Sequence, residues 1–148
     1  MARPDASGTR YRNDAAVPGT GLVYEVRVAR TNRCLALRAK LARSWRERFV
    51  GLLGHRSLAE GDALILPRCR AIHMVGMRFA IDAIFVDRAW RVVALHPGVQ
   101  PGSIGLPVWR AWGVIEASAG TIQGAGVELG DQLQLTAVQG DSGLDKQP

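Results

Sequence analysis

Residues 73–82 form an otherwise apolar segment that contains three polar side chains, His73, Arg78 and Asp82. Because burying an unpaired charge is costly, we expect Asp82 to be ion-paired, hydrogen-bonded or facing a cleft. In a structural role, Asp82 would accept hydrogen bonds from the backbone N–H groups of a turn or pair with Arg78. In a functional role, the three residues would line one rim of a pocket, where a histidine can exchange its proton near neutral pH.

A second group of residues that could do chemistry consists of Trp109, Trp112 and Glu116. Aromatic faces combined with a carboxylate suit stacking on a planar ligand or a sugar. In an extended strand, Trp112 and Glu116 would point to one side and Trp109 to the other, so only Trp112 could join the carboxylate. Packing in the core or on the surface is the alternative for each of these side chains.

Soft metal ligands recur every four residues at Cys69, His73 and Met77. Thiol, imidazole and thioether groups suit copper or zinc, but in a strand successive members would be about 13 Å apart, at roughly 3.3 Å per residue. Pro67 before the segment and Gly76 within it argue against a helix that could gather them. We therefore predict no metal site here and no nucleophile pair formed by Cys69 and His73.

The glycines and serines do not complete a catalytic or cofactor motif. Gly120, Gly124 and Gly126 could expose backbone N–H groups to an anion, but their spacing matches neither the dinucleotide fingerprint nor a phosphate-binding loop. Ser103 lies in the sequence PGSIG and does not form a nucleophile elbow. We expect no cofactor, and the question of catalysis stays open with the balance against it.

These residues must be positioned by a series of short extended segments. Between Leu22 and Ala29 apolar and polar residues alternate, which is typical of a half-buried strand, and Cys34 to Leu41 can pair back on it as a hairpin. Further apolar runs bounded by turn residues are Ala63 to Leu66, Ala71 to Met74, Ile81 to Val86, Arg91 to Leu95, Gly113 to Ser118 and Gln132 to Ala137. Their length and punctuation favour a β sandwich or barrel over alternating β and α units.

One segment has the signature of a helix. Ser44 and Glu47 fit a capping box, and Trp45 and Phe49 begin an apolar stripe at helical spacing. Ile122 to Val127 could add a single helical turn. The sequence therefore predicts a mainly β fold, α+β at the margin: a single-domain β sandwich or barrel-like fold with one short α-helix near residues 44–53.

The chain has 148 residues, 47% of them hydrophobic, which is enough for one well-buried core. We expect one β-rich domain over residues 22–138, between disordered polar tails at residues 1–21 and 139–148. No run approaches the roughly 18 to 20 apolar residues needed to cross a bilayer, and the first twenty residues do not resemble a signal peptide. We therefore expect a cytoplasmic protein without membrane contact. Cys34 and Cys69 could form at most one disulfide, and we expect both thiols to be reduced.

The net charge of +6 is concentrated in one part of the sequence. Residues 27–56 contain nine basic side chains and the single acidic residue Glu47. Such a segment could meet phosphates or an acidic partner, or it could be a solvated face. Arginine outnumbers lysine 17 to 2. We attribute this excess to the codon bias of a GC-rich genome and not to selection for contacts with phosphates, so we do not expect nucleic acid as the main partner.

Four stretches carry a resemblance to a known family: RFVGLLGHRSLAEGDALIL (residues 48–66), CRAIHMVGMRFAIDAIFVD (69–87), VVALHPGVQPG (92–102) and IEASAGTIQGAGVELGDQL (115–133). In content and order they resemble the uncharacterised prokaryotic family called domain of unknown function 192. The resemblance implies a compact β-rich fold with one short helix and no settled activity. The sequence departs from the family at Ala80, where proline is common, and in the turn from Arg88 to Trp90.

The leading hypothesis is a non-catalytic binding module with a shallow pocket for a small ligand, a saccharide or a protein partner. We expect His73, Arg78, Asp82, Trp112 and Glu116 to supply its binding residues. One alternative is a hydrolase or transferase that uses Asp82 or Glu116 as general base with help from His73. Another is binding of nucleic acid or an acidic partner through the basic segment 27–56. The sequence leaves the ligand and the oligomeric state open.

Overall fold

The computed structural model describes residues 23–42 and 57–138 of the chain. These residues form seven strands and one short helix. In chain order the elements are β1 (Val23–Val28), β2 (Cys34–Leu41), β3 (Asp62–Pro67), β4 (Ile81–Val86), β5 (Val92–Val99), β6 (Gly113–Ser118), α2 (Thr121–Ala125) and β7 (Leu133–Val138). The helix predicted near residues 44–53 lies outside the described residues, and the helical turn expected near Ile122 is α2.

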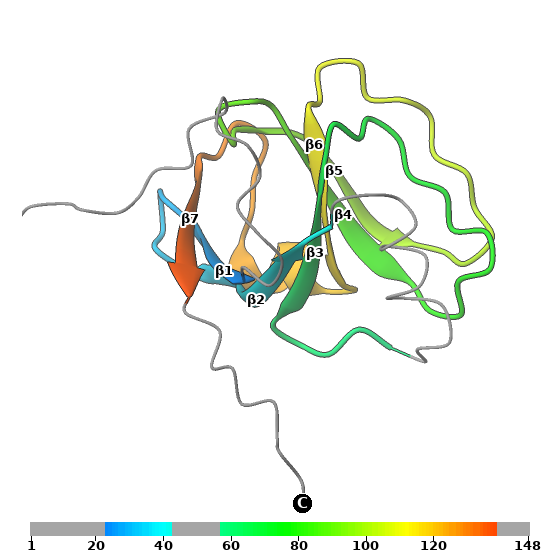
Figure 1. Ribbon diagram of the computed structural model, residues 1–148, viewed down its shortest axis with the longest axis horizontal. Coiled ribbons are helices and arrows are strands. Elements are labelled where there is room, and N and C mark those ends of the chain that lie inside the picture. Colours follow the sequence, from blue (N-terminus) through cyan, green and yellow to red (C-terminus); the bar gives the residue numbers. More distant parts are fainter. Residues whose placement is uncertain (1–22, 43–56, 139–148) are drawn as a thin grey trace, which may run out of the picture.

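The strands form one mixed sheet in the order β5-β4-β6-β3-β2-β1-β7 (Figure 1). All neighbouring pairs are antiparallel except β2 and β3, which run parallel. The two edge strands meet at one corner, where Arg91 forms an isolated bridge with Gln132 and the Leu133 N–H donates to the Trp90 carbonyl at 2.9 Å. The sheet is curled but not closed into a barrel, which confirms the predicted mainly β fold.

The first hairpin follows directly from the local sequence. Tyr24, Val26 and Val28 are buried and alternate with half-buried residues along β1, as their alternation predicts. The turn that leads to β2 places Asn32 in the left-handed region, with φ of 55°, a conformation that asparagine tolerates better than most residues. β2 then pairs antiparallel with β1.

The strand predicted at Ala71–Met74 is not formed. In this segment only His73 makes a bridge, to Ile104, and the chain instead follows residues 100–112 as an irregular pair of loops. The segment has only three apolar residues, Ala71, Ile72 and Met74, and Gly76, with φ of 81°, turns the chain two residues after Met74. The prediction failed because a short apolar run can be buried without joining a sheet.

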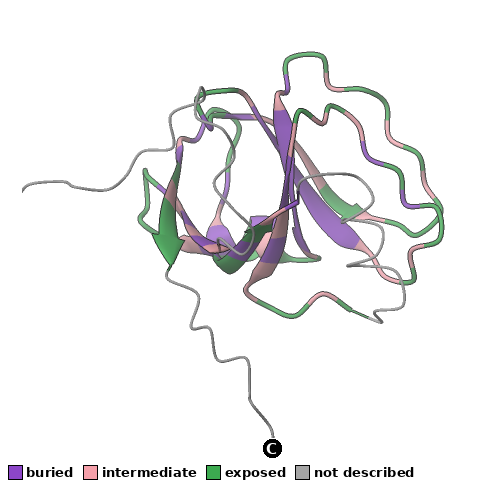
Figure 2. Ribbon diagram, in the orientation of Figure 1, coloured by how far each residue is buried: buried purple, intermediate pink, exposed green. Residues whose placement is uncertain are grey.

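Apolar side chains fill both faces of the central strands. An inner cluster inside the curl includes Val26, Ile84 and Ile115, and an outer cluster on the opposite face includes Phe85 and Val114. β4 is buried along its whole length because both faces are covered, and Figure 2 shows this buried centre surrounded by exposed loops. Segments 68–80 and 100–112 cover the outer cluster, to which they contribute buried side chains of their own.

A buried carboxylate stabilises the hairpin turn against the turn before β7. Asp131 accepts hydrogen bonds from Nε of Arg30 at 2.8 Å, from Nη2 of Arg30 at 3.1 Å and from the Glu128 N–H at 2.8 Å. The Arg30 hydrogen bond lowers the pKa of Asp131, partly opposed by the desolvation of the carboxylate. The pair connects residues that are 101 positions apart in the sequence.

We expect acid to remove the stabilisation that the ion pair between Asp131 and Arg30 gives to the fold. Because the pKa of Asp131 is lower in the folded chain than in the unfolded chain, the carboxylate stabilises the fold above the unfolded pKa of about 4. The contribution is lost as the pH falls through the folded pKa. Urea unfolding at a series of pH values should show that Asp131→Asn is less stable than wild type near neutral pH and loses less stability on acidification. Equal losses in both proteins would contradict this role.

Gly113 is required by the close approach of β6 to β3. A Cβ atom at this position would lie 2.9 Å from the carbonyl oxygen of Leu66, which is backbone and cannot move aside. We expect Gly113→Ala to lower the free energy of unfolding by about 1–3 kcal/mol, measured in urea. Gly124→Ala is the matched control, because a Cβ there meets nothing within 4 Å and alanine favours a helix by up to about 1 kcal/mol.

Candidate functional site

The structure does not bring the predicted site residues together. His73 and Arg78 are exposed on the segment that covers the outer cluster, whereas Asp82 and Glu116 are buried in neighbouring strands. Asp82 faces Ala117 across the pairing of β4 and β6, and Ala117 belongs to the inner cluster. The structure therefore separates residues that were expected to line one pocket: two are exposed over the outer cluster, and two are buried in β4 and β6.

The two buried carboxylates point to opposite faces of the sheet. Glu116 pairs with Ala83, a member of the outer cluster. Because successive residues of a strand alternate between faces, Asp82 lies on the inner face and Glu116 on the outer face. An arrangement in which both carboxylates share one substrate is therefore not available.

Asp82 binds three backbone N–H groups. Its Oδ1 accepts from Gly98 at 2.8 Å, and its Oδ2 accepts from Gly120 at 3.1 Å and from Ile122 at 2.8 Å. These bonds join the end of β5 to the first turn of α2. The carboxylate thus has a structural role as an acceptor of backbone N–H groups. These groups belong to β5 and to the start of α2, and not to a turn next to β4 in the sequence. No ion pair links Asp82 to Arg78.

The glycine N–H groups that could have received an anion already donate within the protein. Gly120 donates to Asp82, Gly124 donates to the Gly120 carbonyl at 2.9 Å, and Gly126 donates to the Gln123 carbonyl at 3.2 Å. At Gly120, the carboxylate of Asp82 takes the place that an external anion would have. These glycines therefore shape a turn and a short helix.

Trp112 and Glu116 do not share a face. The Trp112 ring packs on the inner cluster and meets Trp90 edge-on, with ring centroids 5.6 Å apart and an interplanar angle of 81°. Trp112 precedes β6, which begins at Gly113. The alternation of side chains between the two faces holds only within the strand, so it does not place Trp112 on the face of Glu116. Trp109, in contrast, is 75% exposed.

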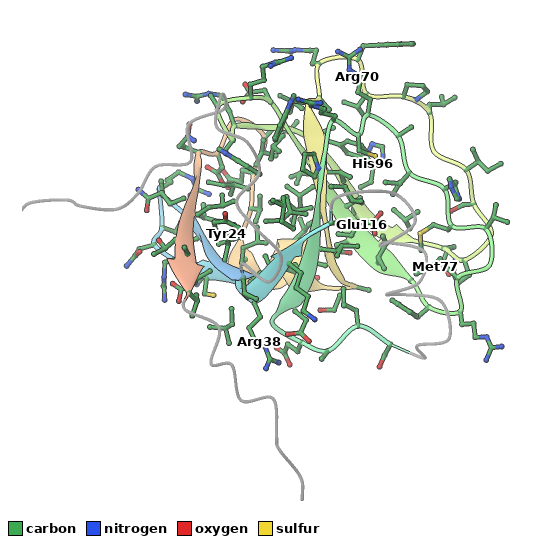
Figure 3. The ribbon with its side chains drawn as sticks, viewed as in Figure 1. Tyr24, Arg38, Arg70, Met77, His96 and Glu116 are labelled. Carbon is green, nitrogen blue, oxygen red and sulfur yellow. The ribbon has the colours of Figure 1, made fainter. Side chains whose placement is uncertain are left out.

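His96 was not identified from the sequence, although it shares the outer face with Glu116. Ala83 lies between them, paired with Glu116 on one side and with His96 on the other. The His96 ring contacts Phe85 with centroids 5.1 Å apart. At about 4.8 Å per strand the two backbones are about 10 Å apart. Glu116 lies in the central strand β6 and His96 in the edge strand β5; both residues are labelled in Figure 3. Only the pairing of β4 with β5 and with β6 shows that His96 and Glu116 share a face, and the local sequence does not predict this pairing.

A hollow open to solvent lies beside α2 and is a candidate site within the described residues. It measures about 790 Å³. Hereafter called the α2 hollow, it is lined by Cys34, Leu35, Leu37, Leu58, Glu60, Gly61, Ser118, Ala119, Gly120, Thr121, Gly124 and Ala125. Three segments that are distant in the sequence therefore build it.

The polar groups of the α2 hollow are few. The hydroxyl groups of Ser118 and Thr121 are hydrogen-bonded to each other at 3.1 Å. Burial raises the pKa of the Cys34 thiol, so the thiol is protonated at neutral pH and is a poor nucleophile. Asp82 accepts hydrogen bonds from the N–H groups of Gly120, which lines the hollow, and of Ile122. The hollow therefore offers hydroxyl groups on a fixed backbone without an activated nucleophile.

Neither a metal site nor a membrane span emerges from the described part of the chain. Within residues 23–42 and 57–138, no group of three or more His, Cys, Asp and Glu side chains is arranged to hold a metal ion. Cys69 donates to the Ala71 carbonyl at 3.0 Å, and Met77 packs on the outer cluster (Figure 3). No helix among these residues is long and apolar enough to span a membrane.

Comparisons with known proteins agree with the fold. The family of uncharacterised proteins called domain of unknown function 192 matches residues 24–135. A proposed transcription regulator from Sinorhizobium meliloti 1021 is similar in structure, with a TM-score of 0.66 and 22% identity over 82% of this chain and 98% of that protein. A protein of unknown function from Novosphingobium aromaticivorans DSM 12444 gives a TM-score of 0.64 and 22% identity over 86% and 99%. No curated protein matches the sequence significantly.

We expect Asp82→Ala to destabilise the fold by about 2–4 kcal/mol, because it leaves three N–H groups without their acceptor. Asp87→Ala is the matched control. Asp87 also accepts two backbone N–H bonds, from Ala89 and Arg91, but at an exposed turn, and its loss should cost about 1 kcal/mol. Urea unfolding measures both changes. A loss for Asp82→Ala no larger than that of the control would show that the buried carboxylate does not stabilise α2.

Proposed function

We propose that this chain, which belongs to the family called domain of unknown function 192, is a binding module that holds a small molecule in the α2 hollow. The observation that carries the proposal is a solvent-open space of about 790 Å³ whose apolar walls carry a pair of hydroxyl groups. Binding sites for small molecules commonly have volumes of about 300–1,000 Å³ and combine apolar walls with a few polar groups.

The walls suit a ligand with an aliphatic part. Leu37 is 57% exposed although it lines the hollow, and Leu58, which also lines it, is half-buried. Covering such side chains with an apolar ligand removes their surface from water, which favours binding by about 25 cal/mol per Å². No aromatic side chain is part of the described lining, so the stacking that often holds sugars is missing. This favours a small aliphatic molecule over a saccharide.

The charge of the lining suits a neutral or cationic molecule. Glu60 is the charged residue among the described lining residues. The hydroxyl groups of Ser118 and Thr121 can accept hydrogen bonds from an amine or an alcohol and can also donate. We therefore propose a small amine or amino alcohol with an aliphatic body as the ligand class.

The basic segment 27–56 gives little support to the alternative of nucleic-acid binding. Within its described part, three arginines make ion pairs with carboxylates of the same chain: Arg27 with Glu25, Arg30 with Asp131 and Arg38 with Asp62. Side chains already held in this way would have to exchange partners before they could meet phosphates. The fold-level similarity to the proposed regulator, at 22% identity, carries no argument about nucleic acid.

Filling the α2 hollow tests the proposal. Gly124 lines it, and a Cβ at this position meets nothing within 4 Å, so Gly124→Leu should occupy the space without straining the backbone. We expect a panel of small aliphatic amines, amino alcohols and diols to shift the backbone amide signals of Ser118 and Thr121 in wild type. The same compounds should cause shifts at least tenfold weaker in Gly124→Leu.

Gln123→Leu is the matched control, because Gln123 is exposed on the same helix and does not line the hollow. This variant should bind as wild type does. If the whole panel leaves the signals of Ser118 and Thr121 unchanged in wild type, or if Gly124→Leu responds as strongly as wild type, the hollow is not the binding site.

A further inference from the structure

Two neighbouring loops carry an unusual combination of exposed side chains. Segments 68–80 and 100–112, hereafter the loop pair, connect β3 to β4 and β5 to β6 and run side by side along the outer edge of the molecule (Figure 1). Large apolar side chains protrude from them to solvent: Val75 is 52% exposed, Ile104 77%, Leu106 84% and Trp109 75%. They make up four of the seven exposed large apolar residues in the described part of the chain.

The charge of the loop pair has one sign. Its two segments contain the four arginines Arg68, Arg70, Arg78 and Arg110 and no aspartate or glutamate. All four arginines are exposed, and none forms an ion pair with a described residue. The exposed apolar side chains are therefore set in a field that attracts anions and repels cations.

The loop pair is held in place by backbone hydrogen bonds. Val108 donates to Arg70 at 2.7 Å, Gly105 donates to Ile72 at 2.9 Å, and Met74 donates to Ser103 at 2.8 Å. The side chains of Ile72 and Met74 are buried in the outer cluster. Because the inward-facing residues fix both segments, the outward-facing apolar residues are presented on a preformed surface.

We propose that the loop pair docks the protein on an anionic lipid surface. Aliphatic side chains and one tryptophan would enter the boundary between headgroups and acyl chains, where tryptophan is favoured. The arginines would meet the lipid phosphates. Such peripheral contact needs no membrane-spanning segment, and the absence of a spanning segment was the reason why no membrane contact was expected from the sequence.

The side chains favour lipid over other anionic partners. Single-stranded nucleic acid is usually held by several aromatic side chains that stack on bases, whereas three of the four exposed apolar residues here are aliphatic. An acidic protein helix would need a groove. The loop pair forms an outer edge of the molecule (Figure 1), which fits a broad surface better.

Co-sedimentation of the full chain with vesicles tests the proposal. We expect binding to vesicles of phosphatidylglycerol and phosphatidylcholine, weak binding to phosphatidylcholine alone, and a loss of at least tenfold on raising the salt from about 0.05 M to about 0.5 M, because salt screens the arginines. The double variant Ile104→Ser with Leu106→Ser should bind at least tenfold more weakly, and so should Arg78→Gln with Arg110→Gln.

Leu129→Ser and Arg33→Gln are the matched controls. Both side chains are exposed and lie outside the loop pair, so both variants should bind as wild type does. Gly124→Leu should also retain lipid binding, which separates this proposal from the one on the α2 hollow.

Three results would overturn the proposal. The first is no binding of the wild-type chain to anionic vesicles at low salt. The second is binding that the loop-pair variants reduce no more than the controls do. The third is preference for a different occupant: an acidic peptide, a single-stranded oligonucleotide or a second copy of the chain is bound through the loop pair while vesicles are not.

Discussion

The carboxylate of Asp82 is the interaction on which the candidate site depends. A buried charge is stable only when hydrogen bonds replace the water it has lost, and here three backbone N–H groups do so. Two of them belong to the start of α2, a helix of only five residues that is too short to be stable alone. The same carboxylate reaches the end of β5. It therefore determines where α2 lies and thereby the shape of one wall of the α2 hollow.

Burial of both faces of β4 and β6 divides the molecule into two sides with different properties. The inner side lies within the curl of the sheet, and two residues of its cluster, Leu35 and Ala125, line the α2 hollow. The outer side is covered by the loop pair, whose inward residues pack on Phe85 and Val114 and whose exposed residues include four large apolar side chains and four arginines. Because the covered strands separate the two sides, a ligand in the hollow and a lipid surface at the loop pair could be bound at the same time.

The sequence predicted the features that depend on neighbouring residues. Alternation along β1, its hairpin with Cys34–Leu41 and the short apolar runs of the central strands each reflect interactions over a few residues, and they identified most of the strands. Asp82 and Glu116 also stood out, because carboxylates in apolar segments are rare enough to need a partner or a function. The same local rules failed at Ala71–Met74, where a loop is buried by packing on the outer cluster.

The sequence by itself determined that the chain forms a β-rich domain and which of its polar residues are unusual. Only the tertiary structure decided which of those residues meet. Whether Asp82 and Glu116 share a face depends on strand order and register, which are set by contacts between residues far apart in the sequence. The α2 hollow likewise joins residues near 34–37, 58–61 and 118–125. Local patterns contain no information about such distant pairs, because register is fixed by the packing of the whole sheet.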